Sequence, residues 1–244
     1  MWKIYDTLLE NLPQNIRITD FASGDIWTMA ETESGGLGLA MTTSGTTIPA
    51  ELESLEGLPS RVACARVKSW NHMEASQAMA AINACYNTES RLGQLGCYEP
   101  FEKYCTEGLD FTGKTVGVIG HMNMPDALLK LTKDVFILER HPKPGDYPDS
   151  ACEYLLPKCD IVLITGSSFV NKTMPRLLQL SSGAYTVVTG PTVPMCPELL
   201  NLGIDRLAGL VITDRNDIRT HVTESRSGPP YRFGRPFLLR GDRG

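Results

Sequence analysis

Small, polar residues recur in this sequence directly after short β-branched runs. The runs end at the segments 120–123 (GHMN), 139–141 (ERH), 165–168 (TGSS), 189–192 (TGPT) and 213–214 (TD). Loops that are rich in glycine and hydroxyl groups let backbone N–H groups approach a bound anion or polar ligand closely. The pattern therefore predicts a binding site for a polar small molecule at these positions, with Asn171 and Thr173 opening the segment that follows the third run.

The first of these loops partly matches a dinucleotide-binding loop. Gly117 and Gly120 are in place, but Asn123 stands where the third glycine of GxGxxG belongs. Glu139 follows Gly120 at the spacing of an acid that binds a ribose. The incomplete motif disfavours NAD. It leaves open a transferase-type enzyme that binds a nucleoside-containing cofactor such as S-adenosylmethionine, with Glu139 on the ribose.

His121 and Glu139 are the candidate metal ligands, because they follow adjacent strands of the predicted sheet. The chain has four histidines and no HExxH, paired-cysteine or calcium-loop motif, so no local spacing marks a zinc or calcium site. A structural hydrogen bond is the alternative role for His121. Ser167 and Ser168 lie outside any GxSxG motif, which favours anion binding over a serine nucleophile.

The second half of the chain must position these residues. From Lys114 onward, apolar β-branched runs alternate with helical segments, which predicts a Rossmann-like parallel sheet with helices on both faces. Helices are expected from a capping pattern at Ser150, around Pro175, and from Pro197 to Gly203. The strands are predicted at 115–120, 134–140, 160–166, 185–190 and 207–213. Ligands of such sheets bind beyond the carboxyl ends of the strands, so the polar loops should gather on one rim.

The first hundred residues predict a smaller α+β domain. Glu74 lies in the first turn of an expected helix, where an acid suits the helix dipole and could also bind a cation. Asn83, near the apolar face of that helix, is either a domain-interface hydrogen bonder or part of the site. A linker between residues 97 and 113 divides the chain into domains 1–108 and 109–244. The expected elements are a helix over 2–12, an antiparallel meander of strands at 16–22, 25–31 and 37–42, and a helix with one apolar face over 73–87.

The composition indicates which classes of binding partner to expect. The net charge of −5 over 244 residues argues against nucleic-acid binding. Seven cysteines without a CxxC pair, no signal-peptide pattern and no apolar run of about 20 residues predict a cytoplasmic protein without a membrane partner. A small molecule or a metal ion is the expected partner, and a homo-oligomer is compatible with the sequence. The arginine-rich end is typical of a solvated tail; its arginines are Arg226, Arg232, Arg235, Arg240 and Arg243.

Two long stretches closely resemble the domain family described as putative heavy-metal chelation, a family of unknown function. They are ERHPKPGDYPDSACEYLLPKCDIVLITGSSFVNKT at 139–173 and VVTGPTVPMCPELLNLGIDRLAGLVITD at 187–214. The shared pattern is Glu-Arg, PGD-P, LLP-x-x-D, TG-S/T-x-x-N-x-T and GP-x-x-P. GLGLAMTT at 36–43 and EASQAMAAINA at 74–84 resemble the companion domain of that family, which implies a fold similar to the enolase N-terminal domain.

The resemblance implies a site in the cleft between the two domains, with chelation of a divalent or heavy-metal ion as its suggested role. At the matching positions it implies ligand-binding roles for Glu74, Asn83, Glu139, Thr165, Gly166, Asn171, Thr173, Gly190 and Pro191. The segment HMNMP at 121–125 departs from the aromatic-proline loop of the family. Its histidine and methionines either favour a soft metal or pack against the neighbouring domain.

The leading interpretation is a heavy-metal-chelating or small-ligand-binding protein whose site lies between the domains. The first alternative is the transferase-type enzyme with a nucleoside-containing cofactor. The second is a non-catalytic interaction module. The residues leave open whether the site is catalytic.

Overall fold

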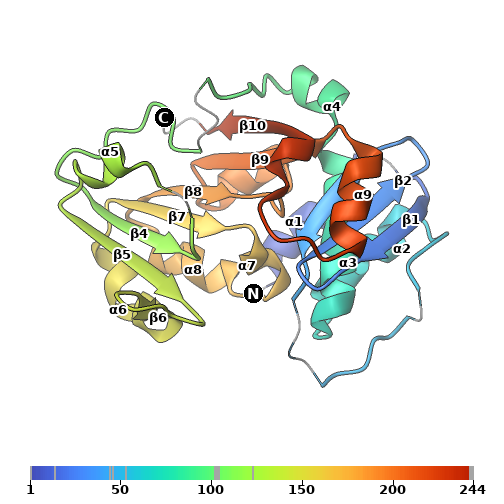
Figure 1. Ribbon diagram of the computed structural model, residues 1–244, viewed down its shortest axis with the longest axis horizontal. Coiled ribbons are helices and arrows are strands. Elements are labelled where there is room, and N and C mark those ends of the chain that lie inside the picture. Colours follow the sequence, from blue (N-terminus) through green and yellow to red (C-terminus); the bar gives the residue numbers. More distant parts are fainter. Residues whose placement is uncertain are drawn as a thin grey trace.

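A small antiparallel sheet is built by the first part of the chain (Figure 1). Its strands are β1 (Ile18–Ser23), β2 (Trp27–Thr32) and β3 (Leu37–Met41), in that order, so the predicted meander is confirmed. Helix α3 (His72–Tyr86) packs on one face, and α9 (Arg215–Thr223) packs on the other. The computed structural model describes residues 2–13, 15–43, 45, 47–52, 54–101, 105–122 and 124–241.

Strand β3 lies directly on the backbone of α3 because two glycines have no side chain to intervene. A Cβ added at Gly38 would lie 2.1 Å from the carbonyl oxygen of Ala80 and 2.1 Å from the nitrogen of Ala84. A Cβ at Gly36, just before the strand, would lie 2.2 Å from the carbonyl oxygen of Ala84. The GLGLA sequence and the alanines of α3 thus permit a close strand-to-helix contact that larger residues would prevent.

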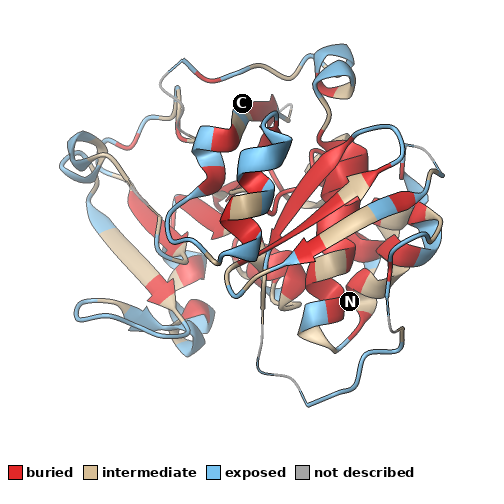
Figure 2. Ribbon diagram, turned by 45° about the vertical axis from the view of Figure 1, so that its right-hand side comes forward, coloured by how far each residue is buried: buried red, intermediate tan, exposed pale blue. Residues whose placement is uncertain are grey.

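Helix α3 is buried on nearly every side, so the expectation of a single apolar face is wrong. The Asn71 side chain accepts a hydrogen bond from the Glu74 N–H and caps the start of the helix. Beyond the small sheet, α3 also contacts α2 (Ser60–Ala65), η1 (Arg66–Lys68) and α7 (Ser167–Val170). These neighbours enclose its polar residues as well, including Glu74, Ser76 and Asn83. Figure 2 shows buried segments running through the centre of the molecule.

The large sheet confirms the predicted Rossmann-like fold. Its strand order is β10-β9-β8-β7-β4-β5-β6, and all neighbours are parallel except β9 and β10. The strands are β4 (Thr115–Ile119), β5 (Asp134–Glu139), β6 (Tyr147–Pro148), β7 (Ile161–Thr165), β8 (Tyr185–Thr189), β9 (Arg206–Ile212) and β10 (Gly234–Arg240). The chain runs outward from β4 to β6, then returns and runs outward from β7 to β10. The direction of strand addition therefore reverses between β4 and β7.

This reversal explains why helices cover both faces. Right-handed crossovers in opposite directions place their connections on opposite faces of a parallel sheet. Phe111 and α5 (Asp126–Leu129) cover the face formed by Val116, Val118 and Leu163. The other face is covered by α6 (Cys152–Leu155), α7, α8 (Met174–Leu180), η4 (Pro197–Leu202) and α1 (Lys3–Glu10).

Residues 234–240 of the arginine-rich end form an edge strand, so the expectation of a solvated tail is wrong for this stretch. Strand β10 pairs with β9 along its whole length, and Arg235 forms ion pairs with Glu89 and Glu99. Pro236 hides this strand in the sequence, yet proline is tolerated at a sheet edge, where one side of the strand needs no hydrogen bonds. Arg243 lies outside the described residues.

Several described residues of the segment expected to be a linker contact the large sheet. Tyr98 forms a β-bridge with Leu238, and Phe111 is buried against the large sheet. The buried guanidinium of Arg206 donates hydrogen bonds to the carbonyl oxygens of Cys105 (2.9 Å) and Glu107 (2.7 Å). These contacts fasten the segment to β9 and β10. The division into domains 1–108 and 109–244 stays a prediction.

Several expected helices differ in detail. The residues after Ser150 form short turns, η2 (Asp149–Ala151), α6 and η3 (Leu156–Lys158), without a capping hydrogen bond from the Ser150 side chain. The segment that ends at Gly203 is a 3-10 helix. The remaining elements are α4 (Glu89–Gln94) and η5 (Pro230–Phe233). Within the described residues no helix is both long and apolar enough to cross a membrane.

Gly38→Ala tests the contact between β3 and α3. The added Cβ would overlap the α3 backbone, so we expect a loss of about 3 kcal/mol in the free energy of unfolding, measured with urea. Gly93→Ala in α4 is the matched control, because among the described residues no atom beyond its chain neighbours and its own helix backbone lies within 4 Å of the added Cβ. Wild-type stability of Gly38→Ala would contradict the packing described.

His221 makes stability depend on pH. It is 1% exposed, and its ring centroid lies 5.0 Å from that of Phe233. Burial lowers the pKa of His221, and Arg232 and Arg226 lower it further. The unfolded chain therefore binds more protons once the pH falls below the unfolded value of about 6.5, and stability is lost.

We expect urea unfolding at about pH 7.5 and about pH 5.5 to show a smaller loss on acidification for His221→Leu than for the wild type. His141→Leu, at an exposed histidine, should keep the wild-type dependence. Parallel pH profiles for wild type and His221→Leu would refute the role of His221.

Candidate functional site

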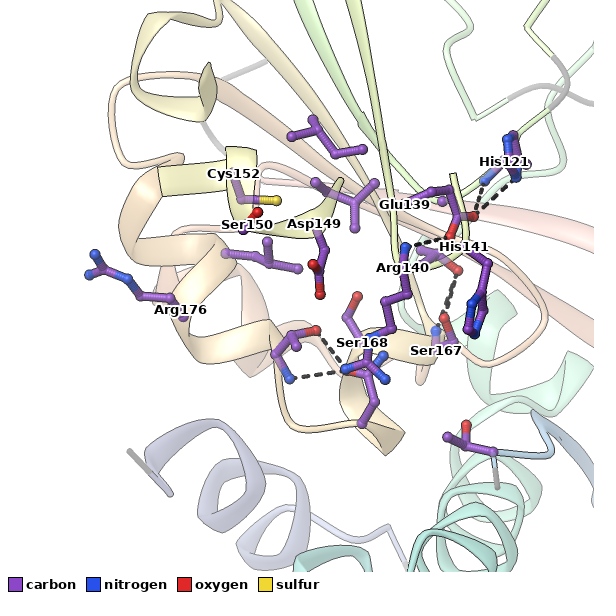
Figure 3. A pocket seen from close by; sticks show the side chains of 18 of the residues that line it. His121, Glu139, Arg140, His141, Asp149, Ser150, Cys152, Ser167, Ser168 and Arg176 are labelled. Atoms are coloured by element: carbon purple, nitrogen blue, oxygen red, sulfur yellow. Dashed lines mark hydrogen bonds and ion pairs between the residues drawn. The ribbon is translucent and has the colours of Figure 1, made fainter. Parts of the chain in front are cut away.

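A cavity of about 760 Å³ opens at the carboxyl ends of β4, β5 and β7. This is the point where the strand order reverses, and open α/β sheets bind their ligands in the crevice that such a reversal creates. The second part of the chain supplies most of the wall, including Ser167 and Ser168 from α7 (Figure 3). Residues 41–43, at the end of β3 and just after it, complete the wall from the first part.

His121 is held between two carboxylates at the rim of the cavity. Its Nδ1 lies 3.2 Å from Glu139 Oε1, and its Nε2 lies 2.6 Å from Asp146 Oδ2. Glu139 also accepts hydrogen bonds from the N–H groups of His121 (2.9 Å) and Arg140 (3.0 Å). The Lys143 N–H and, to a lesser degree, His121 lower the pKa of the Asp146 carboxyl. The group ties the loop after β4 to the loop after β5.

Gly120 permits this arrangement. Its φ of 92° turns the chain sharply out of β4. A Cβ at this position would also lie 3.2 Å from Thr165 Cγ2. A side chain here would therefore be strained and crowded at the centre of the switch point.

The described residues do not assemble a complete metal site. Among them no three His, Cys, Asp or Glu side chains converge as metal ligands. Both ring nitrogens of His121 already face carboxylates. Cys152 lines the cavity, but burial raises the pKa of its thiol to about 11, so it is not a ready thiolate ligand. Metal binding by His121 and Glu139 stays a prediction that requires further ligands from outside the described chain.

The methionines of the loop at 121–125 do not face such a site. Met122 and Met124 pack against the apolar cluster on the face of the large sheet that Phe111 covers. Asn123 lies outside the described residues. The loop thus uses its methionines for packing on its own sheet rather than on the first part of the chain.

Three hydrogen-bond donors of the cavity wall have no partner among the described residues. The Arg140 guanidinium forms no ion pair there, and Figure 3 shows it extending from the end of β5 across the cavity toward Ser168. The Ser168 hydroxyl is buried without a hydrogen-bond partner. Asn171 directs its Oδ1 to the Thr173 N–H (3.1 Å) and hydroxyl (2.6 Å), which leaves its Nδ2 without a partner. Such a wall suits an anionic acceptor.

Contacts with α1 fix the loop that carries Asn171. The Tyr5 hydroxyl donates a hydrogen bond to the Phe169 carbonyl oxygen (2.9 Å). Lys172 adopts a φ of 68°, its Nζ donates to the Val170 carbonyl oxygen (2.7 Å), and it lies over the Tyr5 ring. Burial lowers the pKa of Lys172 to about 8. This unusual backbone conformation places both of its neighbours, Asn171 and Thr173, on the cavity wall.

The opposite wall is anchored by α3. Asn83 Nδ2 donates to the carbonyl oxygens of Leu39 (2.6 Å) and Pro191 (3.4 Å). One turn later, Asn87 donates to the Val193 carbonyl oxygen (2.9 Å) and accepts from the Met195 N–H (2.9 Å). These two amides join β3 to the loop after β8. Thr192 adds a third link, because its hydroxyl oxygen accepts from the Met41 N–H (2.9 Å).

The structure brings some of the predicted site residues together and leaves others apart. Lining the cavity are Gly120, His121, Glu139, Thr165, Asn171 and Thr173. Not lining it are Glu74, Asn83, Gly166, Gly190 and Pro191. Gly166 and Pro191 instead pack where the loop after β8 meets α7 and α3. Glu74 is 2% exposed, and its Oε1 accepts from the Leu52 N–H (3.3 Å).

Sequence reasoning passed over several cavity residues. Arg140 and His141 lie in the strand-end segment 139–141 that the sequence places at the site, but neither was predicted to bind the ligand. Asp149 had no such signal, because it follows the two-residue strand β6. The segment 41–43 could not be placed on the cavity without the contacts of α3.

The fold and the cavity define a Rossmann-like α/β protein with an antiparallel companion sheet and a crevice at its switch point. The chain belongs to the DUF364 family, described as "Putative heavy-metal chelation", which matches residues 108–234. Residues 5–86 match a second family, DUF4213, with the same description.

Solved structures share this architecture. A DUF364 protein of unknown function from Desulfitobacterium hafniense is 34% identical, with a TM-score of 0.87 over 98% of both chains. A second, from Pyrococcus horikoshii, is 22% identical, with a TM-score of 0.79 over 98% of this chain and 100% of that one, and supports the fold alone. An uncharacterized protein of Methanocaldococcus jannaschii is 26% identical over 155 residues, which cover 60% of this chain and 58% of that protein.

Asn87→Ala tests the anchor of the far wall. The change would leave the Val193 carbonyl and the Met195 N–H buried without partners, so we expect a loss of about 3 kcal/mol in unfolding free energy. Asn11→Ala, at an exposed asparagine that bonds only within its helix end, should cost far less. Equal costs for the two variants would show that Asn87 does not anchor the loop.

Proposed function

We propose that this protein binds a small anionic molecule in the cavity between the ends of β4, β5 and β7 and the segment 41–43. The observation that carries the proposal is the unpaired guanidinium of Arg140, which shares the cavity with the unpartnered donors Ser168 and Asn171. An arginine with neighbouring hydroxyl and amide donors suits carboxylate or phosphate groups. The volume falls in the range of small-molecule sites, about 300–1,000 Å³.

The family description supports a second candidate, a complex of the anionic ligand with a metal ion. His121 and Glu139 would then contribute protein ligands at the rim, and the bound molecule would contribute the rest. A ligating histidine commonly has its second nitrogen oriented by a carboxylate, so a metal would replace one of the two carboxylate contacts of His121 and the other would orient the ring.

The nucleoside-cofactor alternative has weaker support. Each carboxylate oxygen of Glu139 already accepts a backbone hydrogen bond, from His121 and from Arg140. A ribose would compete with these bonds. The interaction-module alternative leaves the unpaired donors of the cavity unexplained.

Thermal-shift measurements test the proposal. The probes are inorganic phosphate, sulfate, a series of carboxylic acids, and zinc, nickel and cobalt salts alone and with each acid. We expect at least one anion to raise the melting temperature, since a ligand at 100 times its dissociation constant stabilises by about 2.7 kcal/mol. Arg140→Gln should abolish that shift.

Arg219→Gln is the matched control, because Arg219 lies on α9 and pairs with Asp20, away from the cavity. It should keep the full ligand response. An undiminished response of Arg140→Gln would contradict the proposal. Stabilisation by metals without any anion would favour a metal site that the described residues do not reveal.

A further inference from the structure

Asp149 supplies a carboxylate to the cavity that has no partner among the described residues. It is the first residue of η2, directly after β6, and it lines the cavity. Within the described chain its carboxylate forms neither an ion pair nor a hydrogen bond. Figure 3 shows the side chains of Asp149 and Arg140 projecting into the same hollow from different elements.

The other acidic and arginine side chains that line the cavity already have partners. Arg176 pairs with Glu153, with 2.9 Å between Nε and Oε1. Glu139 is engaged by His121 and by two backbone N–H groups. In the described part of the cavity wall, one unpaired guanidinium and one unpaired carboxylate therefore remain, and they do not pair with each other. A ligand that satisfies both must carry a negative and a positive group.

An organic ammonium group suits Asp149 better than a metal ion does. Among the described residues, Asp149 belongs to no group of three or more His, Cys, Asp or Glu side chains that could hold a metal ion. The neighbouring sulfur of Cys152 is a buried thiol. An ammonium group needs only hydrogen-bond acceptors, and both Asp149 and the adjacent Ser150 line the cavity.

We infer that the ligand is a zwitterion that carries an α-amino acid group, with its carboxylate on Arg140 and its ammonium on Asp149. The inference rests on the proposed function and adds the chemical class of the ligand. The cavity is larger than such a group alone requires, and Leu138, Leu177 and Leu180 line the rest. The ligand therefore also carries a sizeable apolar substituent.

Calorimetric titration of the whole chain tests this inference. The probes are leucine, methionine and phenylalanine, each with the acid that lacks its amino group: 4-methylpentanoate, 4-(methylthio)butanoate and 3-phenylpropanoate. We expect at least one amino acid to bind about tenfold more tightly than its acid, a difference that one ammonium–carboxylate contact supplies. Asp149→Asn should weaken binding of the amino acid about tenfold and leave the acid unchanged.

Asp134→Asn, at an exposed aspartate that begins β5 away from the cavity, is the matched control and should bind like the wild type. Equal binding of acids and amino acids, with Asp149→Asn without effect and Arg140→Gln disruptive, would overturn the inference but keep the proposed function. Binding of neither class would overturn the inference, and it would overturn the proposed function as well only if phosphate and sulfate also failed to raise the melting temperature. Amino-acid binding that survives Asp149→Asn would also overturn the inference.

Discussion

Two amide side chains from one buried helix and its end hold the site together. Asn83 on α3 and Asn87, one turn later, bond to β3 and to the loop after β8. Their partners are backbone groups buried away from water, where an unpaired group is costly, so the amides fix the distance between the two sheets. The segment 41–43 continues from β3 and therefore faces the strand ends of the large sheet. These hydrogen bonds therefore position the segment 41–43 as the second wall of the cavity.

The chain order supplies the other half of the site. Strand addition reverses between β4 and β7, which separates the connections above their carboxyl ends and leaves a crevice there. Arg140 enters this crevice from the end of β5, Asp149 from η2 and Ser168 from α7. The neighbouring acids and bases pair with one another, as in the Glu139–His121–Asp146 group and the Arg176–Glu153 pair. Because these charges are paired, the unpaired side chains of Arg140 and Asp149 indicate the chemistry of the ligand.

Much of this arrangement could be predicted from the sequence, because the central strands are short apolar runs and a parallel sheet gathers its carboxyl ends on one edge. That rule alone predicts that His121, Glu139, Thr165 and Asn171 lie near one another, as they do. The sequence does not reveal β10, because Pro236 and two arginines stand among its apolar residues. It also cannot locate Asp149 or the segment 41–43, which depend on a two-residue strand pairing and on the amides of Asn83 and Asn87.

Hydrogen–deuterium exchange of the native protein, with and without a saturating ligand from the anion or amino-acid series, tests the central claim most directly. Binding between the two sheets should slow exchange together in the segments 41–43, 139–141 and 165–173. Protection confined to the second cavity, of about 690 Å³ beside α4 and the end of β9, would contradict it. So would protection of the strand ends without any change at 41–43.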